Sequence, residues 1–460
     1  MGSSVPGTIR VPCLVVFGRR LLVLLLILAG LGVPAGVLRA TCAGKSCQDG
    51  GGGQARVPFC PLPAHLKADI EAGFRQGRSP DVLAVTRQAG LWSEADPAGA
   101  LAIPWPSLAG GPSTSVPIAF WGTGIARDAR LTPGTGLDQI APTLSDVLGF
   151  RRPHPDVRAG TAVPGVADGE RPRLVLEIAW KGVGSEELKA EPDAWPYLMS
   201  LMRVGAGTMD GDAGSLPLDP AATLTTIGTG GLPSQHGITG TLIRNDRGAV
   251  VRAWGPGAPP SVIATLPDDL DQAMNQKPLI GIVEGDTADQ GIIGGTWYLG
   301  HDRDRVVLAP GSGALPAAER LLGAGFGLDS TPDILAVVLE GPVGSMDAWT
   351  KQLVAAAERA SGGSLAVVVV GTGTNRPATP ATGAALSGVL AQVEAAVPGD
   401  GRVVAATVAG GLFLDQQILA RQGISGDAAV QALLKVTGPD GRSMIDDVFQ
   451  GFAVSFARYC

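Results

Sequence analysis

Short apolar runs alternate with helical patterns over much of the chain. Five runs have the length and β-branched content of strands buried in a parallel sheet; they are Leu174–Ile178, Leu279–Val283, Ile334–Leu339, Leu365–Val370 and Val403–Val408. Helical patterns lie between several of them, at Asp347–Ala360 and Thr382–Ala396. This alternation predicts an α/β fold with a doubly wound, mostly parallel sheet and helices on both faces. Functional residues are then expected at the carboxyl ends of the strands.

A different pattern stands near the N-terminus. Leu21–Leu38 is apolar and uncharged, and it follows Arg10, Arg19 and Arg20. Its length lies between that of a retained membrane anchor and that of a cleaved signal, and we favour the anchor. The basic residues before it place the N-terminus inside and the rest outside. We therefore expect a membrane-anchored extracytoplasmic protein, or a secreted one if this transmembrane or signal helix is cleaved.

Composition and charge narrow the class of protein. The chain has 460 residues, 45% of them hydrophobic, which is enough for one large core or two modest ones. Its formal net charge is −7, and it has no cluster of Lys and Arg beyond short pairs. These features are those of a globular protein that does not bind nucleic-acid polymers.

Five cysteines agree with an extracytoplasmic placement. Cys13 lies on the membrane side of the apolar segment. The other four cysteines would lie outside, in an oxidising compartment where an even number can pair in disulfides; they are Cys42, Cys47, Cys60 and Cys460. Two disulfides are the natural expectation. A zinc cluster is not indicated, because only Cys42 and Cys47 are close in sequence. Residues 43–57 are rich in Gly and predict a flexible tether, so residues 1–56 form an anchor with its tether.

The segment Leu216–Gly240, LPLDPAATLTTIGTGGLPSQHGITG, is the most informative part of the chain. It resembles the nucleophile-bearing segment of the nucleotide pyrophosphatases and phosphodiesterases in the alkaline phosphatase superfamily. The resemblance is specific in its last part, a turn motif made of Thr229, Gly230, Pro233, His236, Gly237 and Ile238. It implies an alkaline-phosphatase-like fold and phosphoester hydrolysis as the ancestral activity.

The order of the resembling segments is unusual. Three segments resemble the end of the family's chain: Arg78–Val85 a strand, Val116–Ile125 the last strand and Asp138–Gly149 the last helix. All three precede Pro172–Trp180, which resembles the family's opening strand. We interpret this as a circular permutation of one domain, residues 57–460. Residues 57–150 would supply the family's C-terminal portion, 151–171 a linker, and 172–460 the N-terminal and middle portions. A Cys60–Cys460 disulfide would then join the new ends. The alternative is two unrelated fragments or two domains.

The resemblance also implies two zinc ions held by Asp and His at strand ends. The first ligand position falls near Ala179, with Glu177 one step deeper in the strand. After the strand ending at Leu339 stand Glu340 and Asp347 but no His, and the last two positions fall in Gly371–Asn375 and Gly110–Ser115. The four histidines of the chain are His65, His154, His236 and His301. We therefore expect no metal site of the family type.

Two smaller candidates come from the same segments. Ser215, in Ser-Leu-Pro, best matches the family's nucleophile, although Leu218 occupies the position counted back from Thr229. Without an activating group we favour Ser215 as a helix N-cap or turn residue. A hard-metal site from Asp286, Asp302 and Asp304 has little support from spacing.

Two functions follow. The first, which we prefer, is a membrane-tethered domain of this superfamily that has lost catalysis and binds a ligand or protein partner as a binding or scaffolding module. The second is an active phosphodiesterase or nucleotide pyrophosphatase with a rearranged site, with zinc as its cofactor and Ser215 as nucleophile. The second requires Glu177, Asp219, Glu340 and Asp347 to converge. Residues 249–308 match nothing interpretable and could form a cap over the ligand.

Overall fold

The computed structural model describes residues 58–88, 91–94, 102–109, 113–127, 129–295, 297–298, 303–373, 388, 390–395, 397, 402–437 and 441–460. The chain separates into two compact units, Met1–Arg56 and Val57–Cys460. The expectations for Leu21–Leu38, Cys42, Cys47, the tether, His301 and Asp302, and for most of Thr382–Ala396, lie outside the described residues. In the part of the chain that is described, no helix is long and apolar enough to cross a bilayer.

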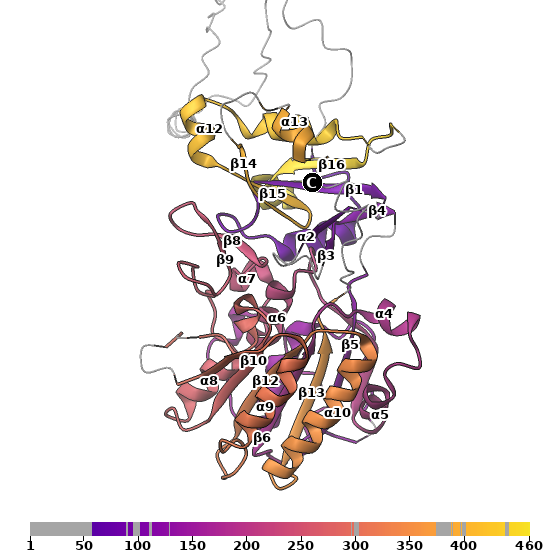
Figure 1. Cartoon of the computed structure of the whole chain (residues 1–460), viewed down its shortest axis with the longest axis vertical. Coiled ribbons are helices and arrows are strands. Elements are labelled where there is room, and N and C mark those ends of the chain that lie inside the picture. The colour runs from indigo at the N-terminus through magenta and orange to yellow at the C-terminus, as the bar shows by residue number, and fades with distance from the viewer. Residues whose placement is uncertain are drawn as a thin grey trace, which may run out of the picture. The chain divides into compact units, whose positions relative to one another are not determined.

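The larger sheet of Val57–Cys460 has seven strands in the order β11-β10-β12-β6-β13-β5-β7. Their bounds are β11 (Arg305–Leu308), β10 (Ile280–Glu284), β12 (Asp333–Leu339), β6 (Leu174–Trp180), β13 (Leu365–Gly371), β5 (Ser115–Gly122) and β7 (Ala206–Asp212). Figure 1 labels β10, β12, β6, β13 and β5 of this sheet. The strands from β11 to β13 are parallel, whereas β5 is antiparallel to both of its neighbours. The predicted α/β fold is confirmed, and β6, β10, β12 and β13 are predicted strands.

Helices cover both faces of this sheet because its central strands are apolar on both sides. Every residue of β6, β12 and β13 is buried. Val175 and Ala179 of β6 pack in one cluster with residues of α3 (Ile140–Leu148), α6 (Pro220–Thr229) and α8 (Leu266–Ala273). Leu176 and Ile178 pack in another with residues of α5 (Pro196–Val204), α9 (Ala314–Leu322) and α10 (Val343–Ala360). The predicted helix Asp347–Ala360 is the greater part of α10.

A second, smaller sheet corrects one prediction. Its order is β14-β15-β1-β16, with β4 paired to β1; the strands are β14 (Val404–Val408), β15 (Gly411–Leu414), β1 (Val82–Gln88), β16 (Ile445–Gln450) and β4 (Ser107–Ala109). The expectation that Val403–Val408 belongs to the parallel sheet is wrong, because β14 pairs antiparallel with β15. The turn between them has only two residues, and Gly410 takes φ +73° there, which favours a hairpin.

The smaller sheet brings distant parts of the chain together. Strand β1 pairs antiparallel with β16, from Val82 opposite Gln450 to Thr86 opposite Ile445, and the two lie side by side in Figure 1. Cys60 and Cys460 form a disulfide across 400 residues of sequence, with their Cα atoms 5.1 Å apart. This predicted disulfide is confirmed. It ties the segment before α2 (Ala64–Gly73) to the residue after η6 (Gly451–Tyr459).

The remaining elements are short. They are the hairpins β2 (Trp92–Glu94) with β3 (Ala102–Pro104) and β8 (Leu242–Arg244) with β9 (Val250–Arg252), the helices α4 (Ser185–Ala190), α7 (Pro233–His236), α12 (Gln416–Gln422) and α13 (Gly426–Leu434), and the 3₁₀ turns η2 (Leu137–Gln139), η3 (Pro155–Val157), η4 (Thr287–Ile292) and η5 (Gly311–Gly313). Residues of α12 and α13 pack with the smaller sheet in a separate core.

Candidate functional site

Charged side chains gather where three parallel strands of the larger sheet end. Lys181 follows β6, Glu284 is the last residue of β10, and Glu340 follows β12. The Lys181 ammonium lies 3.0 Å from the carboxylate of Asp289, in η4, and 3.7 Å from that of Glu340. Lys181, Glu284 and Asp289 are buried, and Glu340 is partly exposed. We call these four residues the edge cluster. It occupies the end of a parallel sheet at which ligands usually bind.

The positive charge in the edge cluster is the ammonium group of Lys181. Burial raises the pKa of Glu284 to about 8, Asp289 adds to this shift, and Lys181 opposes it. Burial also raises the pKa of Asp289, and Lys181 again opposes the shift. Glu284 is therefore largely protonated at neutral pH, while Lys181 offsets the charge of Asp289. Without any bound ion, the ammonium of Lys181 thus offsets one of the two carboxylates that it contacts, those of Asp289 and Glu340.

The residues present do not fit the zinc pair that the resemblance implies. An ammonium group stands among the carboxylates, and it would repel a second cation at short range. Within the described ranges no three His, Cys, Asp or Glu side chains are grouped so as to hold a metal ion. Asp286, which we considered as a hard-metal ligand, is instead paired with Arg252.

The end of β13 is closed by backbone contacts and an apolar side chain. The amide N–H of Gly182 donates to Thr372 Oγ1 at 2.9 Å, and the amide of Thr372 donates to the carbonyl of Trp180 at 3.2 Å. Leu218 is fully buried, and a Cβ on Gly373 would lie 3.0 Å from its Cδ1. The position that the resemblance gives to the nucleophile is thus a packed leucine.

Before α6, the carboxylate of Asp219 has structural hydrogen-bond partners, whereas the hydroxyl of Ser215 has none among the described residues. Asp219 is the N-cap of α6, and its carboxylate accepts hydrogen bonds from the amide of Ala221 (3.0 Å) and from Thr241 Oγ1 (2.8 Å). Ser215 is fully buried, and its Oγ has no hydrogen-bond partner among the described residues. Asp219, not Ser215, is the N-cap of α6, so that half of the prediction is wrong, whereas Ser215 does lie in a bend of the loop before α6. Among the described residues, no base that could activate the Ser215 hydroxyl is hydrogen-bonded to it.

The turn motif is a structural device. His236 is fully buried; its Nδ1 accepts from the amide of Ile238 at 3.1 Å, so the ring proton is on Nε2, 3.1 Å from Thr226 Oγ1. Burial lowers the pKa of His236 to about 3, and Arg78 and Arg75 lower it further. Gly230 and Gly237 take φ +75° and +83° at the ends of α6 and α7, which a side chain would strain. Pro233 is in the first turn of α7.

Thr229, the remaining member of the motif, also has a structural role. Its hydroxyl donates to the carbonyl of Thr225 at 2.6 Å, inside α6. It also accepts from the amide of Gly231 at 3.1 Å, which fixes the residue after the helix. The motif therefore shapes the connection between α6 and α7, and nothing in its geometry presents a reactive group.

The four carboxyl groups that the rearranged site requires do not converge. Glu177 lies in the middle of β6, between Ala336 and Val368 of the neighbouring strands. Its Oε1 lacks a hydrogen-bond partner in the described structure, and burial raises its pKa to about 8. Asp347 accepts from the first amides of α5, at Tyr197 (3.0 Å) and Leu198 (2.8 Å).

Two of the four carboxyl groups, those of Glu340 and Asp219, lie near the same cation, Lys181. Glu340 belongs to the edge cluster, and Asp219 lies close enough to Lys181 for this charge to lower its pKa, although burial raises it more. Sequence reasoning missed Lys181, Glu284 and Asp289. The available signal was the position of Lys181 and Glu284 at the ends of predicted strands.

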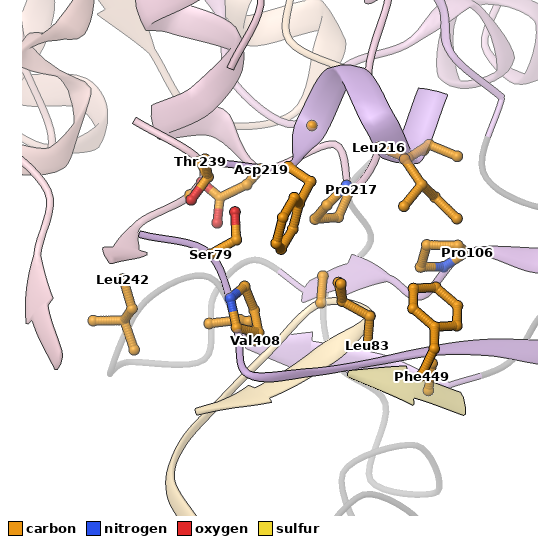
Figure 2. Close-up of a pocket in the computed structure, with 18 residues that line it drawn as sticks. Ser79, Leu83, Pro106, Leu216, Pro217, Asp219, Thr239, Leu242, Val408 and Phe449 are labelled. Atoms are coloured by element: carbon orange, nitrogen blue, oxygen red, sulfur yellow. The ribbon is translucent and has the colours of Figure 1, made fainter. Parts of the chain in front are cut away.

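A small cavity separates the start of α6 from the smaller sheet (Figure 2). Ser79, Asp219 and Thr239 give it one polar corner, whereas Leu83, Phe449 and other apolar groups form the rest. Thr239 Oγ1 is buried and has no partner among the residues that the structure describes. The volume is about 20 Å³, which is room for one water molecule. The cavity is too small to be a substrate site.

Comparison with known proteins gives a sparse result. No protein-family model matches the chain. No curated protein matches it. Among solved structures, the chain is similar to a mutant of alkaline phosphatase PafA at 13% sequence identity and a TM-score of 0.41, over 63% of this chain and 86% of the other. A TM-score of this size does not establish a common fold.

Proposed function

We propose that this protein is an extracytoplasmic, membrane-tethered domain on an alkaline-phosphatase-like plan that has lost catalysis and acts as a binding or scaffolding module. The observation that carries the proposal is Lys181. Its ammonium stands at the end of the strand whose counterpart in the resembling family ends with a metal ligand, and it pairs with Asp289 and Glu340. A side chain thus supplies the positive charge that a metal would bring.

The state of the other positions supports the same proposal. Leu218 fills the nucleophile position, and Thr372 and Gly373 close the end of β13. The turn motif keeps its backbone form, since Gly230 and Gly237 have the positive φ angles that such turns need. A domain with an intact framework and filled reactive positions is suited to presenting a surface rather than to turning over a substrate.

The permuted order and the tether belong to this proposal. Val116–Ile125 contains most of β5, which pairs with β13, and the Cys60–Cys460 disulfide holds the two ends of the domain together, as a permuted chain would permit. Leu21–Leu38 has the composition of a membrane anchor, or of a signal if it is cleaved.

The test combines two measurements on the purified full chain. Elemental mass spectrometry would measure bound metal, and a chromogenic phosphodiester would report turnover. We expect no stoichiometric zinc and no turnover from a sample with native circular dichroism. Zinc near one or two equivalents together with turnover would overturn the proposal.

The hydrolase alternative has its own variants. It gains support from Asp219 and Glu340, which both lie near Lys181. If turnover were found, Glu340→Ala and Glu177→Ala should each abolish it, whereas Glu319→Ala, on the exposed face of α9, should not. Unchanged turnover in Glu340→Ala and Glu177→Ala would remove these residues as the candidate site.

A further inference from the structure

A pocket of about 240 Å³ opens between the smaller sheet and the segment that joins α2 to β1. Its lining combines side-chain amides, one ion pair and two phenyl rings; the residues that define it are Phe74, Asp81, Arg244, Gln416, Gln450 and Phe452. We call it the amide pocket. Its volume is close to the lower end of the range found for small-molecule sites. It is distinct from the edge cluster, with which it shares no residue.

The charges of the amide pocket cancel within the pocket. Arg244 pairs with Asp81, and the same guanidinium donates to the carbonyl of Leu414 at 3.0 Å. Asp81 also accepts from the amide of Leu414 at 2.7 Å and from Gln416 Nε2 at 2.9 Å. An ionic ligand would find no unpaired opposite charge here and would lose its hydration. The lining therefore selects an uncharged ligand.

The amide groups are held in one orientation. Gln416 Nε2 donates a hydrogen bond to Asp81, and Gln450 Nε2 donates one to Asp427 Oδ1 at 2.5 Å. In both residues the amide oxygen keeps its capacity to accept hydrogen bonds, two per oxygen. Arg244 Nε also lacks a hydrogen-bond partner among the described residues, but this atom is buried and a ligand in the pocket does not reach it. Hydroxyl groups, which can donate to the two amide oxygens, match this set.

Two aromatic rings supply an apolar wall. The side chain of Phe452 is 52% exposed, and Phe74 is half-buried. A phenyl ring beside fixed polar groups suits a ligand with a C–H face and a hydroxyl rim. We propose that the amide pocket binds a neutral carbohydrate, one sugar ring lying against Phe452 with its hydroxyls on Gln416 and Gln450. This inference does not depend on whether the edge cluster has lost catalysis.

The experiment is saturation-transfer NMR on the full chain with a panel of probes. Glucose, galactose, mannose and N-acetylglucosamine are the neutral probes, and glucose 6-phosphate and glucosamine are the charged ones. We expect signals from at least one neutral sugar and weaker signals from its charged analogues. No signal from any neutral sugar on folded protein, or tighter binding of a charged analogue, would overturn the proposal.

Matched variants locate the binding. Gln416→Ala and Phe452→Ala should each weaken the affinity about tenfold, as expected for the loss of one good contact in a shallow site. Gln417→Ala and Phe456→Ala change exposed neighbours outside the pocket and should leave it unchanged. If Gln416→Ala and Phe452→Ala bind as well as the unmodified protein, the sugar binds elsewhere and the inference is wrong. The phosphodiester assay is a separate readout, so either proposal can fail alone.

Discussion

The edge cluster and the amide pocket use polar groups in opposite ways. In the edge cluster, Lys181, Asp289 and Glu284 are buried and face one another. In the amide pocket, Gln416 is exposed and Phe452 is more than half exposed, while the charges beneath them are paired. In the edge cluster Lys181 and Asp289 satisfy each other, although Glu284 Oε2 has no hydrogen-bond partner among the described residues, whereas polar groups at an opening can be reached by a ligand. The strand ends alone therefore do not decide where a ligand would bind.

The largest effect should come from Lys181→Met. It leaves Asp289 as a buried carboxylate without its cation, which costs about 4 kcal/mol of unfolding free energy. Urea unfolding followed by circular dichroism measures this. Lys189→Met, which breaks an exposed pair with Glu186, is the control and should leave the midpoint in place. A midpoint unchanged in Lys181→Met would mean that the edge cluster is open to water.

Removal of the disulfide should come next. Cys60→Ser together with Cys460→Ser frees a loop of 400 residues in the unfolded chain, and we expect a loss of about 3 kcal/mol. The same urea titration, with and without reductant on the unmodified protein, checks it. A loss seen in the variant but absent on reduction would point to local strain from serine rather than to chain entropy.

A smaller effect concerns pH. The pKa of Glu177 is raised from 4.5 to about 8, so between these values the unfolded chain releases a proton that the folded chain keeps. The folded state therefore loses stability as pH rises from 4.5 towards 8. Glu177→Gln removes this group's share of the slope, so its gain in stability over the unmodified protein should grow by about 1 kcal/mol for each pH unit above 4.5. Glu319→Gln, on an exposed surface, should keep the slope of the unmodified protein; an equal slope in Glu177→Gln would contradict the burial of this carboxyl.

The smallest effect should be that of Gln416→Ala on stability. Its side chain is exposed and shares one hydrogen bond with Asp81, so the unfolding free energy should change by less than about 0.5 kcal/mol. Thermal unfolding by calorimetry is sensitive enough. A loss of several degrees would show that the amide holds the smaller sheet together, as Lys181 does for the edge cluster.

How far the sequence predicts this structure depends on the range of the interactions. Strands β6, β10, β12 and β13 are predicted because an apolar β-branched run suffices to form a buried strand. Val403–Val408 has the same apolar, β-branched composition as these strands, but the two-residue turn at Gly410 makes it pair antiparallel with β15. The candidate site was harder to predict. Lys181 meets Asp289 across 108 residues of sequence, and no local pattern reveals that contact.

The roles of the predicted site residues also depend on contacts between segments that are distant in the sequence. The sequence places Glu177 one step too deep for a ligand, but the pKa of Glu177 depends on its burial under helices that belong to distant segments. Ser215 and Asp219 are four positions apart, and only the structure shows which of them caps α6. Spacing thus identified the residues of this loop, and three-dimensional packing gave each its role.

The disulfide has a mechanical consequence. A force applied to the chain before Cys60 and at Cys460 would pass through the sulfur–sulfur bond and bypass the 399 residues between the two cysteines. Neither sheet would bear the load, so β1 would not be pulled away from β16. A pull on the two ends of Val57–Cys460 would therefore load one covalent bond and leave the antiparallel pairing of β1 with β16 intact.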